Sequence, residues 1–146
     1  MANYTTTSDI IFYRPDVDSY DQAYFPNYHT QATIDVNRKL EVEWYRQAAT
    51  NMGIDWKVTA FNADLLLNSA TQLKQAAAFR VLYYVYAALT IKTDDFFAAM
   101  RDIYEKMYNN EIESVISQGI DYDWDESGAI DDDEKAESAP RRLYRA

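Results

Sequence analysis

The stretch from Asp123 to Glu134, DWDESGAIDDDE, has the composition and spacing of a calcium-binding loop. Acidic residues occupy its first, third, ninth and twelfth positions, and a glycine occupies the sixth. Calcium takes about six to eight oxygen ligands, and the sharp bend of such a loop requires glycine at position six. The sequence therefore predicts a calcium site with these ligands: the side chains of Asp123, Asp125 and Ser127, the backbone carbonyl of Ala129, Asp131 directly or through water, and both carboxylate oxygens of Glu134.

A solvated acidic linker is the alternative interpretation of the same residues. Ser127 stands where calcium loops usually have aspartate or asparagine, and the flanking helices are poor, because Gly119 precedes the loop closely and Pro140 follows it. A loop without a partner hand should also bind calcium weakly. If calcium binds, we expect it to neutralise the clustered carboxylates and to stiffen the C-terminal segment, which is a structural role.

The final residues, APRRLYRA, reverse the charge of the acidic stretch. Three arginines surround a leucine and a tyrosine, after a proline that favours an extended entry. Arginine and tyrosine are enriched at interface hot spots. The sequence therefore predicts a docking peptide, with solubility as the simpler alternative, and the partner-binding residues are Arg141, Arg142, Leu143, Tyr144 and Arg145.

Composition argues against a catalytic centre. The chain has no cysteine, which excludes a disulfide scaffold, a thiolate metal site and a cysteine nucleophile. Its single histidine, His29, lies in the loop-like stretch NYHTQ, without an evident serine or carboxylate constellation. The chain has only three glycines, and they do not form a glycine-rich phosphate-binding motif. We therefore expect that the chain is not an enzyme.

The charge of −10 is concentrated in one segment. Residues 121–134 contain eight acids and no base, which leaves −10 + 8 = −2 for the rest of the chain. Such a chain does not bind DNA by neutralising phosphates, although it could line a passage through which DNA slides. No apolar run approaches the roughly 20 residues of a membrane span, and the N-terminus lacks the features of a signal peptide. We expect no membrane association, and a protein of the cytosol or of a particle assembled there.

Hydrophobic periodicity predicts an all-α fold, a small bundle of three long helices with additional short helical turns. The helices are expected at residues 30–51, 70–89 and 94–118, with Thr93 as the cap of the third and Gly119 as its end. Phe96, Met100, Ile103, Met107 and Val115 are expected near one face of this third helix, and Phe97, Tyr104 and Tyr108 are expected to widen that face. Arg80 interrupts the apolar second helix and needs a carboxylate partner or an exit to solvent. Residues 1–29 are expected to form an extended or irregular N-terminal arm, residues 30–119 the helical bundle, and residues 120–146 the EF-hand-like acidic loop and basic docking tail.

The order of these segments resembles the head-to-tail adaptor proteins of tailed bacteriophages, also called connector, neck or head-completion proteins. The resemblance covers most of residues 30–146 and is carried by TIDVNRKLEVEWYRQA, FNADLLLNSATQLKQAAAFRVLYYVYAAL, DDFFAAMRDIYEKMYNNEIESVI and, most distinctively, GIDYDWDESGAID. It implies a virion protein, assembled in the host cytoplasm, that forms a ring, commonly of twelve copies, beneath the portal. Such rings extend the DNA channel without binding specific DNA sequences and offer a platform for tail or neck proteins. By the same resemblance, residues 141–146 would grip the portal.

Two other functions remain open on the sequence alone. A tail-completion or neck protein would bind the tail tube instead of the portal. A small calcium-binding regulatory protein would bind calcium tightly and change conformation as an isolated chain. The missing partner hand argues against the regulatory function.

Overall fold

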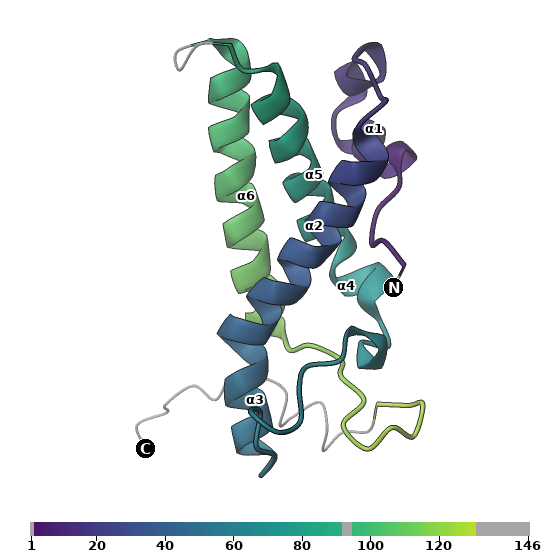
Figure 1. Cartoon of the computed structure of the whole chain (residues 1–146), viewed down its shortest axis with the longest axis vertical. Helices are drawn as coiled ribbons and strands as arrows, with labels where there is room; N and C mark the ends of the chain where they lie inside the picture. Colours follow the sequence, from purple (N-terminus) through teal and green to yellow (C-terminus); the bar gives the residue numbers. More distant parts are fainter. Residues whose placement is uncertain (1, 92–94, 131–146) are drawn as a thin grey trace.

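The computed structural model describes residues 2–91 and 95–130, and this part of the chain is mostly helical with no strand (Figure 1). The all-α prediction is therefore confirmed. The elements are α1 (Thr7–Tyr13), the 3₁₀ turn η1 (Pro15–Ser19), α2 (Phe25–Leu40), the π turn η2 (Glu41–Tyr45), α3 (Arg46–Asn51), the 3₁₀ turn η3 (Ala63–Leu65), α4 (Ser69–Gln72), α5 (Lys74–Leu89) and α6 (Phe96–Gln118). None of the described helices is both long and apolar enough to cross a membrane.

Helix α2, η2 and α3 form one uninterrupted helical rod from Phe25 to Asn51. It begins five residues before the predicted start, because Pro26 lies in its first turn, where a missing N–H costs no hydrogen bond. The π turn lies in the middle of the rod. Such a turn adds one residue to the helical repeat, and the adjacent side chains Trp44 and Tyr45 are both buried.

Helix α5 is the central element of the fold. Its sequence is apolar nearly all the way round, as expected for a buried helix, and it packs against α6 and α2 (Figure 1). The predicted single helix over 70–89 is interrupted at Leu73, which separates α4 from α5. Leu73 is fully buried, so the chain turns there without leaving the core.

Helix α6 ends where the sequence predicts, at Gly119, whose φ of +95° is strained for any residue with a Cβ. The side chain of Asp95 caps its first turn by accepting a hydrogen bond from the Ala98 amide at 2.7 Å. The proposed cap Thr93 lies outside the described residues.

The buried face of α6 agrees with the predicted one only in part: Tyr104, Tyr108 and Val115 are buried as expected, whereas three other expected residues are exposed. The side chains of Phe96, Ile103 and Met107 are 56%, 48% and 37% exposed. The residues that α6 buries are Ala98, Tyr104, Tyr108, Ile112 and Val115. The helix therefore carries a second apolar stripe that faces outward.

The N-terminal segment, predicted to be irregular, contains α1 and η1. Thr6 and Asp9 form a capping box at the start of α1, and Ile10 is fully buried. His29 holds this segment against α2: its Nδ1 lies 2.7 Å from the Thr5 hydroxyl and its Nε2 lies 3.3 Å from the Thr7 hydroxyl. Burial lowers the pKa of His29. The histidine therefore has a packing role.

The carboxylate partner of Arg80 is Asp35 on α2. The Arg80 Nε donates to Asp35 Oδ2 at 2.9 Å, and the Tyr84 hydroxyl donates to the same oxygen. The guanidinium also stacks over the ring of Tyr108 at 5.0 Å. Burial opposes ionisation of Asp35, but hydrogen bonds from Tyr84, Arg80 and Gln31 outweigh it and lower the pKa of this carboxyl group. This network joins α2, α5 and α6.

Candidate functional site

The segment that follows α6, residues 119–124, includes the first two residues of the predicted acidic loop and is packed into the body of the protein. Ile120 is fully buried, and Asp121, Tyr122 and Asp123 are buried as well. We call residues 119–124 the strap. The sequence predicts a separate C-terminal segment from residue 120, whereas the first residues of that segment pack against the helical body.

Backbone and amide hydrogen bonds hold the strap in place. The Gln72 side chain donates to the Gly119 carbonyl at 3.1 Å and accepts from the Asp121 amide at 3.0 Å. Asn68 donates to Asp121 Oδ2 at 2.6 Å. At the far end, the Asp123 amide donates to the Leu65 carbonyl at 2.9 Å. The strap therefore has partners in α4 and in the segment that precedes it.

An aromatic cluster fixes the strap from its other side. Its members are Trp44, Tyr45, Phe61, Tyr122 and Trp124. The Tyr122 and Trp124 ring centroids are 4.6 Å apart, and Trp124 stacks on Tyr45 at 5.7 Å with an interplanar angle of 11°. Burial raises the pKa of Tyr122 to about 12, and its hydroxyl accepts from the Asn62 amide at 3.1 Å. Aromatic pairs of this kind add stability beyond the area they bury.

The first half of the predicted calcium loop folds around Asp123. Its Oδ1 accepts from the Ser127 amide at 3.0 Å, and its Oδ2 accepts from the Gly128 amide at 2.8 Å. Gly128 adopts a φ of +85°, the left-handed conformation that favours glycine at a sharp bend. A carboxylate has about four lone-pair sites. Asp123 can therefore keep both amide hydrogen bonds and still offer oxygen to a cation.

Only some of the other predicted metal ligands lie within the described residues. Asp125 Oδ1 also accepts from the Ser127 amide, at 3.1 Å, and the Ser127 hydroxyl donates to the Ala129 carbonyl at 3.1 Å. Asp131 and Glu134 lie outside the described residues. Within the described residues, no three acidic or histidine side chains gather into a metal-binding group. The described half shows the bend at Gly128 and the amide hydrogen bonds to Asp123, and the metal site itself stays a prediction.

The predicted docking peptide also lies outside the described residues. Its five partner-binding residues, Arg141, Arg142, Leu143, Tyr144 and Arg145, therefore stay a prediction. The last described residues leave the aromatic cluster at the end of the molecule opposite the α5–α6 connection (Figure 1).

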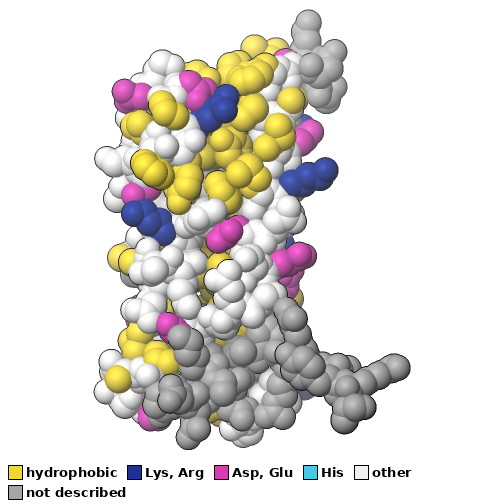
Figure 2. Space-filling model, turned by 180° about the vertical axis from the view of Figure 1, so that it is seen from behind, with side chains coloured by type: hydrophobic (Ala, Val, Ile, Leu, Met, Phe, Trp, Pro, Cys, Tyr) yellow, Lys and Arg dark blue, Asp and Glu magenta, His cyan; other side chains and the backbone are white. Residues whose placement is uncertain are grey.

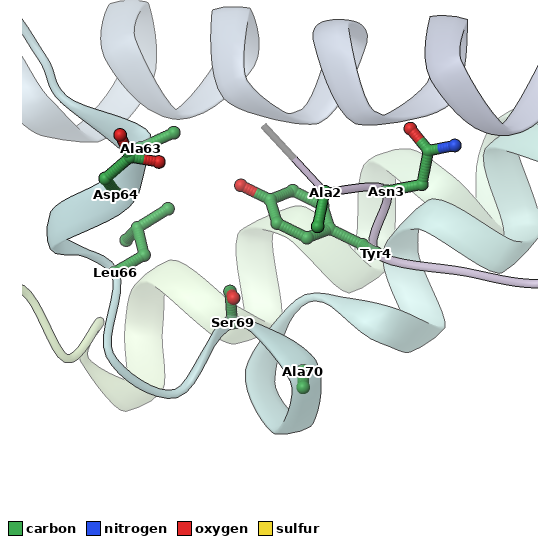
Figure 3. Close-up of a pocket in the computed structure, with 8 residues that line it drawn as sticks. All are labelled: Ala2, Asn3, Tyr4, Ala63, Asp64, Leu66, Ser69 and Ala70. Atoms are coloured by element: carbon green, nitrogen blue, oxygen red, sulfur yellow. The ribbon is translucent and has the colours of Figure 1, made fainter.

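A pocket of about 290 Å³ lies beside the segment that receives the strap (Figure 3). Asn3 and Tyr4 line one side of it, and Asp64, Leu66 and Ser69 line the other. Among the described residues that line it, Asp64 is the only charged side chain. The pocket brings no nucleophile and base together, so it does not indicate catalysis.

Sequence reasoning missed the strap, although a signal for it was present. Ile120, Tyr122 and Trp124 alternate with acidic residues, which is typical of an extended segment with one buried face. The structure goes further, because it buries Asp121 and Asp123 as well. The contributions of Gln72 and Asn68 have no comparable signal, because their partners are about fifty residues away in the sequence.

Comparison with known proteins leaves the function open. No protein-family model, no curated protein and no solved structure matches this chain. The function therefore has to be argued from the residues and their geometry.

Proposed function

We propose that the chain is a structural protein of a tailed-bacteriophage virion, a head-to-tail adaptor that forms a ring under the portal, joins head to tail and extends the DNA channel. The order of its helices, acidic loop and basic tail supports this function. The observation that carries the proposal is the strap, because it makes the start of the C-terminal arm part of a rigid helical body. A C-terminal arm that binds a partner benefits if its first residues are held in a fixed position.

In this proposal the three long helical segments form the bundle of the adaptor, and the acidic loop is an EF-hand-like calcium clamp. Asp123, Asp125, Ser127 and Ala129 would hold the ion together with Asp131 and Glu134. Calcium supplies positive charge that neutralises the clustered carboxylates. A loop stiffened next to the strap would fix the direction of the docking peptide, so less conformational entropy would be lost when Arg141–Ala146 binds the portal.

The acidic surface suits a DNA conduit. The net charge of −10, eight units of which lie in residues 121–134, contains no basic excess that would neutralise phosphates, so DNA would pass through the ring without adhering to it. The alternative function as a tail-completion protein predicts the same charge but a different partner, the tail tube.

Replacing Asp123 with alanine should abolish calcium binding and weaken attachment to the portal protein of the same virus by about tenfold, because the arm would be ordered only on binding. The measurement is calorimetric titration with calcium, followed by sedimentation of the chain with purified portal. Wild-type protein in a calcium chelator should behave like the variant. Asp102→Ala, which removes an exposed acid from α6, is the matched control and should leave both properties unchanged.

The possible results distinguish the hypothesis of a calcium clamp from the hypothesis of an adaptor. Loss of calcium binding with unchanged attachment would refute the clamp and leave the adaptor proposal standing. Absence of attachment in the wild type would refute the adaptor. Binding to the tail tube would then support tail completion, and a calcium-driven conformational change in the isolated chain would support regulation.

A further inference from the structure

A different pocket, of about 260 Å³, lies between the start of α2 and the end of α5. Four aromatic rings and one carboxylate line it, and they belong to Tyr20, Tyr24, Phe25, Tyr28 and Asp21. It lies at the end of the molecule where α5 leads to α6 (Figure 1), and hydrophobic side chains gather over this end on the side shown in Figure 2. We call it the tyrosine pocket.

Neighbouring rings hold two walls of the tyrosine pocket in place. Tyr28 stacks on Tyr84, with the ring centroids 6.0 Å apart and an interplanar angle of 19°. Phe25 is buried, and its ring centroid lies 6.2 Å from that of Tyr28. Tyr24 differs from them, because it is 61% exposed. The pocket is therefore largely formed before any ligand enters, which lowers the entropy lost on binding.

The described lining residues of the pocket bring negative charge and no positive charge. Asp21 supplies the formal charge. One of its oxygens accepts a hydrogen bond from the Ala23 amide at 3.0 Å, which leaves further lone pairs for a ligand. Burial raises the pKa of Tyr28, and the proximity of Tyr24 and Asp21 raises it further. The surroundings of the Tyr28 hydroxyl therefore favour a positively charged group.

Other charges near the pocket are balanced. Arg14, whose charge acts on Tyr20, is paired with Asp16 at 2.8 Å. The positive N-terminal end of α2 and the negative C-terminal end of α5 both lie at the pocket, so they offset one another. The charge left unbalanced is that of Asp21, and the faces of the aromatic rings add to its attraction for cations.

The lining suits a cation that carries an apolar stem. Aromatic faces attract a guanidinium or an ammonium group within about 6 Å of the ring centroid. Val85, Ala88 and Leu89 form the α5 wall of the pocket, against which a methylene stem can pack. The volume is below the roughly 300–1,000 Å³ of small-molecule sites, so it suits a single side chain. Arginine fits better than lysine, because its planar, weakly hydrated guanidinium stacks on rings.

We propose that the tyrosine pocket binds an arginine side chain presented by a partner protein. The guanidinium would lie against Tyr24 and Tyr28 and pair with Asp21, and the stem would lie along the α5 wall. The net charge of −10 favours the approach of a basic partner at long range. The inference goes beyond the adaptor function and does not depend on it, because the binding is measured on the free chain without portal.

NMR titration of the isotope-labelled chain with Nα-acetyl-arginine N-methylamide tests the pocket. We expect saturable binding with a Kd on the order of 1 mM, and the largest shifts in residues 20–28 and 85–89. The citrulline analogue has nearly the same shape without the charge, so it should bind at least about fivefold more weakly. Equal binding of both analogues, or shifts that do not saturate or lie elsewhere, would overturn the proposal.

Asp21→Asn removes the charge and keeps an oxygen for the Ala23 amide, so the fold should stay intact while the arginine analogue binds at least about fivefold more weakly. Asp18→Asn is the matched control. Asp18 is also exposed but is not among the described residues that line the pocket, so this variant should bind like the wild type. Equal weakening in both variants would mean general attraction to an acidic surface and would refute the site.

Two substitutions of Tyr24 test the contact between cation and ring. Tyr24→Leu keeps an apolar side chain without a ring and should weaken binding of the arginine analogue about threefold, whereas Tyr24→Phe should bind like the wild type. The exposure of Tyr24 means that neither change disturbs the core, and circular dichroism confirms that the helices are intact. Equal binding by the two variants would contradict the proposed contact.

Discussion

Replacing Asp35 with alanine is expected to lower the free energy of unfolding by about 3 kcal/mol. Asp35 is the carboxylate that receives hydrogen bonds from Arg80 and Tyr84 at the centre of the fold. Its loss would leave the guanidinium of Arg80, whose side chain is only 21% exposed, without a counter-charge. Urea denaturation followed by circular dichroism measures the effect.

The matched control for Asp35 is Asp102→Ala, which removes an exposed acid from a surface pair with Arg101. Surface pairs contribute little, so we expect a change below about 0.5 kcal/mol. Equal effects of the two substitutions would mean that the Asp35 network does not stabilise the fold.

The same network predicts an acid dependence. Because the pKa of Asp35 is lower in the folded state, its contribution is fully present above the unfolded pKa of about 3.9. It is lost as the pH falls through the folded value. The difference in unfolding free energy between wild type and Asp35→Ala should therefore shrink in strong acid. A difference that stays constant down to the folded pKa and below it would contradict the ionised pair.

The second large effect is expected at Tyr122, where alanine should cost about 3–4 kcal/mol. The ring is buried among Trp44, Phe61 and Trp124, so its removal leaves a cavity at the root of the acidic loop. The strap should loosen, and hydrogen exchange of the Asp123 amide, which is bonded to Leu65, should accelerate.

Tyr122→Phe distinguishes the contribution of the aromatic ring to stability from that of the hydroxyl group. It keeps the aromatic contacts and removes the hydroxyl, which accepts from the Asn62 amide and also hydrogen-bonds the Tyr45 side chain. We therefore expect a loss of about 1 kcal/mol with the strap still protected. Unchanged exchange of the Asp123 amide in Tyr122→Ala would show that the aromatic cluster does not anchor the strap.

Local signals in the sequence predict the elements well where one feature dominates. Gly119 ends α6, and the nearly uniform apolar run of α5 makes it the central helix. The early start of α2 was missed although Pro26 is a good first-turn residue, and α1 was missed although Thr6 and Asp9 have the spacing of a capping box. The π turn that contains Trp44 leaves no sequence signal.

Choices between equally apolar surfaces could not be made from periodicity. Helix α6 has one stripe through Phe96 and Ile103 and another through Tyr104 and Tyr108, and only packing against α5 decides which is buried. The partner of Arg80 is likewise decided by the tertiary structure. The sequence offers 24 acidic residues, and nothing in it distinguishes Asp35 from the others. In the candidate site, the bend at Gly128 was predictable, whereas the burial of the strap depends on contacts with α4 and the aromatic cluster.

Electron microscopy of the chain mixed with the portal protein of its own virus, in calcium-containing buffer, tests the adaptor proposal most directly. We expect a ring of this protein on the narrow end of the portal, with the residues RRLYRA in contact with portal subunits. Free portal beside unattached protein, at concentrations well above micromolar, would contradict the proposal.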